Sequence, residues 1–135
     1  ENIPQVLAEC RRVLKDEGRF LCSTYGKQHM WEITDLVQQF HKEIVLSAEV
    51  LYERFGLENG ENLLAPYFPE IQMRRYEGAI EIAEAEPLIS YILSCHGNQN
   101  QLLLNQYKEF REFVSARVAD GFHITKDAGI FLCRK

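Results

Sequence analysis

Three features that mark common functional classes are missing from this sequence of 135 residues: a long apolar run, a basic stripe and closely spaced cysteines. No apolar stretch approaches the roughly 20 residues that a membrane-spanning helix needs, so we expect no membrane partner. Acidic residues outnumber basic ones by 20 to 15, and the net charge is −5. The basic pairs Arg11-Arg12 and Arg74-Arg75 are too short to form the stripe typical of nucleic-acid binding proteins, so we expect no nucleic-acid partner.

The cysteines and histidines show no redox motif and no metal-binding motif. The cysteines lie in apolar stretches without C-x-x-C spacing, at Cys10, Cys22, Cys95 and Cys133. A domain of this length does not need disulfides, so we interpret them as reduced core thiols of a cytoplasmic protein. The histidines also lack the spacing of metal ligands, and no metal site is predicted; they are His29, His41, His96 and His123.

The remaining composition is that of an ordinary globular domain. Hydrophobic residues make up 46% of the chain and charged residues 26%, both close to the averages of soluble proteins. A chain of this length buries roughly two-thirds of the surface that it exposes when unfolded. We therefore predict one domain that spans residues 1–135.

The first part of the chain predicts a surface helix followed by a buried strand. Apolar residues at helical spacing indicate a helix that begins near Asn2 and ends near Asp16, and Gly18 is suited to a left-handed cap after it. A strand is predicted at Arg19–Tyr25. Its apolar run without alternation is typical of a strand buried on both faces in a parallel sheet, whose carboxyl end is a common ligand site.

Further helices and a second strand are expected in the middle of the chain. The apolar stripe of residues 30–44 predicts a helix that leaves the carboxyl end of the first strand. Short helical segments are expected at 47–55 and 59–68. Alternation in residues 71–82 predicts a strand with a bend at Gly78.

The last third predicts two helices and a hairpin. The helices cover residues 87–97 and 107–119, and the polar residues 98–101 are expected to form a break between them. Apolar residues alternate on both sides of 126–129, which has turn chemistry. A terminal antiparallel hairpin is therefore predicted.

The junction of the first helix and strand carries a family motif. It resembles the helix–turn–strand of the fifth strand in class I S-adenosylmethionine-dependent methyltransferases, where the pattern is close to R-V-L-K-P-G-G-x-h, with h apolar. The matching residues are Arg12, Val13, Leu14, Lys15 and Gly18. Asp16-Glu17 replaces the Pro-Gly of the family.

This resemblance implies an α/β fold: the C-terminal sheet portion of a Rossmann-like methyltransferase, holding the fifth to seventh strands with flanking helices. The sheet order of that family is 3-2-1-4-5-7-6, and its last strand runs antiparallel between the fifth and the sixth. The helices at about 87–119 then resemble an insertion. The family's glycine-rich cofactor loop and ribose-binding acidic residue would lie upstream of Glu1. The chain alone is therefore expected to bind no S-adenosylmethionine and to be inactive.

The resemblance also implies where a small methyl acceptor would bind. The carboxyl end of the first strand would form the rim of the acceptor pocket, with His29 assisting proton removal. Tyr91 and His96 would belong to a lid over the acceptor. The predicted substrate-binding residues are Tyr25, His29, Met30, Trp31, Tyr91 and His96. The catalytic residues remain unassigned.

Other interpretations of the same patterns stay open. The chain could be an autonomous α/β interaction or dimerisation domain without catalysis. It could also belong to another doubly wound enzyme whose nucleotide site lies outside it. In the methyltransferase interpretation the strand Arg19–Tyr25 lacks a partner on one edge. We therefore expect a homodimer.

Overall fold

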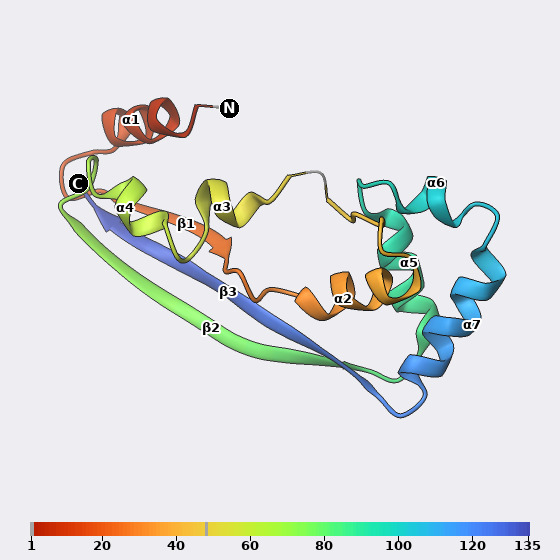
Figure 1. Ribbon diagram of the computed structural model, residues 1–135. Coiled ribbons are helices and arrows are strands. Elements are labelled where there is room, and N and C mark those ends of the chain that lie inside the picture. Colours follow the sequence, from red (N-terminus) through yellow and green to blue (C-terminus); the bar gives the residue numbers. More distant parts are fainter. Residues whose placement is uncertain (1, 48) are drawn as a thin grey trace. The chain divides into compact units, whose positions relative to one another are not determined.

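The computed structural model describes residues 2–47 and 49–135, and over these residues the chain is a mixed α/β protein with seven helices and three strands. Figure 1 shows the elements in chain order. Glu1, the start of the predicted domain, and Ala48, within the helical segment expected at 47–55, lie outside the described residues.

Contacts divide the chain into two units, each made of separate stretches of sequence. We call the first the sheet unit; its described residues are 2–29, 51–77 and 127–135. The second is the helical unit, formed by the described residues of 30–50 and 78–126. The predicted helical insertion at 87–119 lies entirely within the helical unit.

Helix α1 spans Ile3–Val13 and begins as the sequence predicts. The Asn2 side chain accepts a hydrogen bond from the Gln5 backbone N–H at 3.2 Å, which satisfies one of the free donors of the first turn. Pro4 stands in this first turn, where a missing N–H costs nothing. The helix buries Leu7 against the sheet unit's core.

Three strands form one antiparallel sheet in the order β1-β3-β2. They are β1 at Arg19–Tyr25, β2 at Glu70–Ile82 and β3 at Phe122–Arg134. Strand β1 pairs with β3 from Arg19 opposite Arg134 to Tyr25 opposite Ala128. The last strand of the chain is therefore the central one, and β1 is an edge strand (Figure 1).

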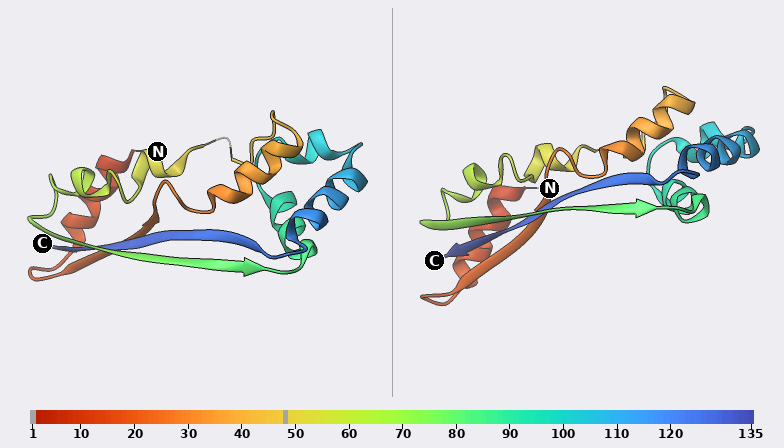
Figure 2. Two further views of the ribbon diagram at one scale, coloured as in Figure 1. Left: turned by 60° about the horizontal axis from the view of Figure 1, so that its bottom comes forward. Right: turned by 90° about the horizontal axis from the view of Figure 1, so that it is seen from below.

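Among the described residues of the sheet unit, the helices lie on one face of the sheet. This unit also contains α3 at Leu51–Phe55 and α4 at Gly60–Leu64, which lie on one side of β1 and β3 (Figure 2). The buried residues of its core are Leu7, Leu57, Leu64, Phe68, Phe131 and Cys133.

The opposite face of β1 is open. Phe20 and Cys22 pack on the core, whereas Leu21 between them is 59% exposed. Successive side chains of a strand point to opposite faces. The expectation that β1 is buried on both faces of a parallel sheet is therefore wrong, because β1 pairs with an antiparallel strand and its second face has no covering helix among the described residues.

The predicted terminal hairpin is also wrong, because residues 126–129 continue strand β3 without a turn. Two contacts with neighbouring strands keep this stretch extended. Asp127 forms an ion pair with Arg75 of β2. Gly129 lies opposite Thr24 of β1, and a Cβ at Gly129 would be 2.7 Å from the Arg74 carbonyl oxygen. Glycine is needed here because the two strands approach each other closely, and not because the chain turns.

The helical unit is built from α2 at Trp31–Phe40, α5 at Ala85–Ser94, α6 at Gln99–Leu103 and α7 at Tyr107–Val118. Its core joins apolar residues of all four helices to Ile44 and Ile124. Phe40 meets the Phe110 ring edge-on with centroids 5.2 Å apart, a favourable arrangement for aromatic pairs.

Helix α6 corrects the prediction of a polar break at residues 98–101, and it gives the 87–119 segment three helices rather than two. The polar side chains there bond to the unit's own backbone. Asn98 accepts from the Val45 N–H at 2.8 Å and donates to the Glu43 carbonyl at 2.8 Å. Gln99 is fully buried. The polar residues 98–101 are therefore part of the packed helical unit and do not form a solvated loop.

Candidate functional site

The main candidate site is a groove of about 520 Å³ at the carboxyl end of β1. All of its lining residues belong to the sheet unit, and no Asp, Glu, Lys or Arg is among them. They are Ser23, Thr24, Tyr25, His29, Leu51, Tyr76, Ala128, Gly129 and Ile130. Apolar walls with a few hydroxyls and one imidazole suit a small uncharged ligand.

Tyr25 and His29 form one wall of this groove. Their rings stack with centroids 5.0 Å apart and an angle of 21° between their planes. Burial raises the pKa of the Tyr25 phenol, so this hydroxyl stays protonated at neutral pH. Thr24 is anchored separately, because its hydroxyl donates to the Phe55 carbonyl at 2.6 Å.

The loop at residues 26–29 leaves β1 beside the groove, and each of its residues is held by a hydrogen bond. The backbone N–H groups of Gly26, Lys27 and Gln28 donate in turn to the Asp127 carbonyl, the Glu58 carboxylate and the Asp127 carboxylate, at 3.0, 3.2 and 3.3 Å. His29 Nδ1 accepts from the Asp127 backbone N–H at 3.2 Å. We call residues 26–29 the rim loop. Two carboxylate residues distant in sequence therefore fix its path.

Arg75 joins these two carboxylates. Its guanidinium donates from Nε to Asp127 Oδ1 at 2.6 Å and from one terminal nitrogen to Oδ2 at 2.8 Å. The same terminal nitrogen reaches Glu58 at 3.1 Å. The Asp127 side chain is only 5% exposed, whereas that of Arg75 is 35% exposed. A bidentate pair of this kind is strong and orients both groups.

The ion pair shifts the pKa values of Asp127 and Arg75 in the directions that favour their charged forms. Hydrogen bonds from Arg75 hold the pKa of Asp127 below its usual range, against the opposing effect of burial, and the pKa of Arg75 is raised by the same bonds. Both groups are therefore charged across the physiological range. The sequence pattern does not indicate this network, since Asp127 lies in a stretch with turn chemistry. The pairing of Arg75 and Asp127 across 52 residues left no local signal.

Gly26 is required by the close approach of this pair. A Cβ at Gly26 would be 2.2 Å from Asp127 Oδ2 and 2.8 Å from a terminal nitrogen of Arg75. Any side chain there would displace the carboxylate that holds the rim loop. In the sequence this glycine simply follows the predicted strand Arg19–Tyr25.

Met30 and Trp31, two further predicted site residues, lie in the helical unit. Met30 precedes α2 in a left-handed conformation with φ of 58°, and its N–H donates to the Thr125 carbonyl at 2.8 Å. Such a backbone is uncommon for a residue with a side chain. Trp31, the first residue of α2, is 49% exposed.

Tyr91 and His96, the predicted lid residues, also belong to the helical unit. Tyr91 lies on α5 and is 44% exposed, and its carbonyl accepts from the Ser94 hydroxyl at 2.7 Å. His96 is exposed just beyond the end of α5. Among the predicted residues, the structure thus brings Tyr25 and His29 together in the groove.

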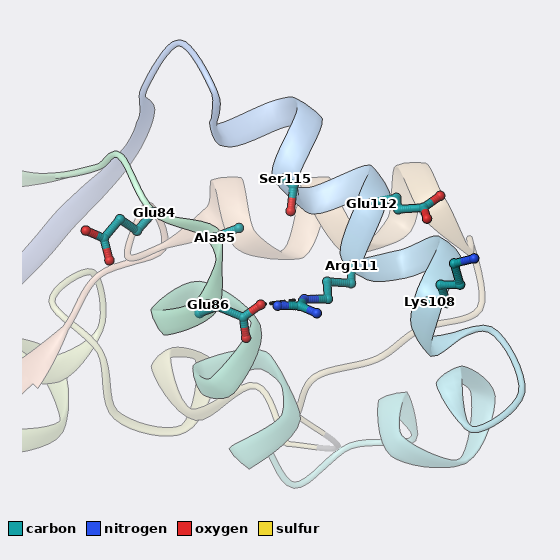
Figure 3. Close-up of a pocket in the computed structure, with 7 residues that line it drawn as sticks. All are labelled: Glu84, Ala85, Glu86, Lys108, Arg111, Glu112 and Ser115. Carbon is teal, nitrogen blue, oxygen red and sulfur yellow. Dashed lines mark hydrogen bonds and ion pairs between the residues drawn. The ribbon is translucent and has the colours of Figure 1, made fainter.

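A second, larger hollow of about 710 Å³ lies between α5 and α7 in the helical unit. Figure 3 shows its lining, where Arg111 and Glu86 form an ion pair at 2.5 Å. Both side chains are more than half exposed. Solvated ion pairs of this kind are ordinary surface features, so this hollow does not define a ligand site.

The four cysteines are free thiols. Burial is the main cause that raises the pKa of Cys22 to about 11, and the neighbouring thiols Cys133 and Cys10 add to the shift. A high pKa means little thiolate at neutral pH and hence low reactivity. Cys22 therefore has the properties of a packing residue and not of a nucleophile.

The described residues contain neither a metal-ligand cluster nor a helix that could cross a membrane. Within the part of the chain that the structure describes, no group of three or more His, Cys, Asp and Glu side chains could hold a metal ion. None of the described helices is both long and apolar enough to cross a membrane. No protein-family model matches the chain, and no curated protein sequence matches it.

Proposed function

We propose that the chain is the C-terminal part of a class I S-adenosylmethionine-dependent methyltransferase that acts on a small molecule. The observation that carries the proposal is the strand order. Strand β3 is last in sequence, lies between β1 and β2, and runs antiparallel to its neighbours. This is the order in which the fifth, seventh and sixth strands occur in that family. The Arg12-Val13-Leu14-Lys15 motif immediately precedes the strand that takes the fifth position.

In this proposal the groove is the part of the acceptor pocket that the chain supplies. Its uncharged lining fits a small uncharged acceptor, and Tyr25 and His29 form its wall. Met30 and Trp31 extend the same segment, and Tyr91 and His96 belong to a lid. The free, weakly acidic thiols fit a reducing compartment such as the cytoplasm.

The chain's own residues do not fit the cofactor. The described sheet contains the three strands just named, and the family binds S-adenosylmethionine through a glycine-rich loop after its first strand and an acidic residue that binds the ribose hydroxyls. No G-x-G sequence occurs in the chain. The chain is accordingly proposed to contribute a sheet edge and acceptor contacts, and to be inactive in isolation.

Calorimetric titration with S-adenosylmethionine tests this proposal in two arms. The chain alone should give only the heat of dilution. Extended by the coding sequence that precedes Glu1, it should bind with a dissociation constant in the micromolar range, because the extension restores the cofactor loop. The proposal fails if the preceding sequence holds no apolar strand with a glycine-rich turn, or if the extended protein does not bind.

A second candidate function is an autonomous dimerisation domain. It is favoured by the open edge and face of β1, where Leu21 is 59% exposed. Exposed apolar strand edges recruit other chains. The two candidates differ in one respect: the methyltransferase proposal predicts that the upstream sequence covers this edge, so that the extended protein no longer associates through it.

A further inference from the structure

The hydrogen bonds of the rim loop determine which ring nitrogen of His29 carries the proton. His29 Nδ1 lies 3.2 Å from the Asp127 backbone N–H, which can only donate. A ring nitrogen that accepts a hydrogen bond must be unprotonated. In the neutral imidazole the proton is then on Nε2.

The position of the Asp127 backbone depends in turn on its side chain. Both carboxylate oxygens are held by Arg75, and Oδ2 also accepts from the Gln28 N–H. The Asp127 carbonyl accepts from the Gly26 N–H at 3.0 Å. Besides the N–H bond to His29, Asp127 thus bonds to Gly26 through its carbonyl and to Gln28 through its carboxylate. The bidentate ion pair with Arg75 fixes the position of Asp127.

Glu58 makes this arrangement a closed network. Its carboxylate accepts from both Arg75 and the Lys27 N–H, at 3.1 and 3.2 Å. Movement of the rim loop away from Asp127 would therefore break bonds to two carboxylates at once. The stacking of Tyr25 on the His29 ring restrains the remaining ring rotation.

We propose that Asp127, held by Arg75 and Glu58, is a positioning residue that keeps His29 in its Nε2-protonated form. A base that removed a proton at Nε2 would need a lone pair on that nitrogen, and the alternative Nδ1 is committed to the Asp127 N–H. In this form His29 carries its proton on Nε2 and does not act as a base at that nitrogen. A role of His29 toward a methyl acceptor rests on the proposed function, whereas the protonation of His29 does not.

Long-range ¹H–¹⁵N correlation NMR on the ¹⁵N-labelled chain tests the inference. At a pH where the rings are neutral, His29 should show the pattern of a nearly pure Nε2-protonated ring. His96 is exposed and serves as the control; it should show the averaged signals of two exchanging forms. An Nδ1-protonated pattern for His29, or averaging equal to that of His96, would overturn the proposal.

The variant Arg75→Gln tests whether the ion pair positions His29 or only stabilises the fold. Arg75→Gln removes the bidentate clamp but leaves the Asp127 backbone N–H in place. In the folded variant the population of the minor His29 form should rise several-fold. Glu86→Gln, which breaks the exposed Arg111 pair of the helical unit, should leave the His29 signals unchanged. A folded Arg75→Gln chain with wild-type His29 signals would show that the ion pair has no positioning role.

The outcomes for this inference and for the proposed function are distinguishable. Failure of the extended protein to bind S-adenosylmethionine would leave the His29 protonation unaffected. An Nδ1-protonated ring would leave cofactor binding by the extended protein unaffected and would return His29 to the role of a base.

Discussion

Replacing Asp127 with alanine should lower the free energy of unfolding by about 2–3 kcal/mol. The change leaves the Arg75 guanidinium without its bidentate partner and the Gln28 N–H without an acceptor. Breaking a fully buried pair costs more than this, but Arg75 keeps 35% of its side chain exposed and retains Glu58. Urea unfolding followed by circular dichroism measures the loss.

The matched control for this experiment is Glu86→Gln, which removes an ion pair of similar length that is more than half exposed. Its effect should stay within about 0.5 kcal/mol, as is usual for solvated pairs. A loss for Asp127→Ala no larger than that of the control would mean that the Arg75–Asp127 pair does not hold the rim loop.

The same pair should make the chain sensitive to acid. The pKa of Asp127 is lowered in the folded chain from its ordinary value of 3.8, chiefly by hydrogen bonds from Arg75. Folding therefore gains from the charged carboxylate in full above about pH 4, and this gain is lost as the pH falls further through the folded pKa. Asp127→Asn should show a flatter decline of unfolding free energy below pH 4 than the unaltered chain. Equal slopes would contradict the assignment.

Self-association through β1 is the second large effect that we expect. Among the described strands β1 pairs with β3 alone, and the Tyr25 carbonyl at its carboxyl end accepts from the Leu57 N–H at 3.3 Å. The open stretch of the edge is therefore residues 19–23. Within this stretch the apolar side chain of Leu21 is 59% exposed. Two copies can cover this surface by pairing their edges about a two-fold axis.

Light scattering at micromolar concentration should give a mass of twice 15.7 kDa. Leu21→Lys places a charge on the edge and should weaken the dimer by about tenfold or more, equivalent to about 1.4 kcal/mol. Leu104→Lys is the matched control, because Leu104 is 76% exposed and lies in the helical unit. A monomeric unaltered chain, or equal effects of the two substitutions, would remove the edge as the site of association.

Local sequence patterns predicted the elements that depend on their own residues. The bounds of β1 at Arg19–Tyr25 and the Asn2 cap of α1 follow from apolar spacing and capping chemistry. The pairing of β1 with the last strand was expected from the family resemblance, and the sheet order agrees with it. For the site, the prediction named Tyr25 and His29, which line one groove.

The tertiary structure decided the features that depend on contacts between residues far apart in the sequence. Residues 126–129 have turn chemistry, yet they form part of one continuous strand because Asp127 pairs with Arg75 and Gly129 lies close to the backbone of β2. The polar run at 98–101 caps and begins helix α6, and the Asn98 side chain bonds to the backbone of Val45 and Glu43, more than fifty positions away. The protonation of His29 likewise depends on a backbone group 98 residues distant. By itself the sequence determined the start of α1 and the bounds of β1, since capping, backbone preference and apolar spacing are local. Burial, ion pairing and the site's hydrogen bonds required partners that only folding brings together.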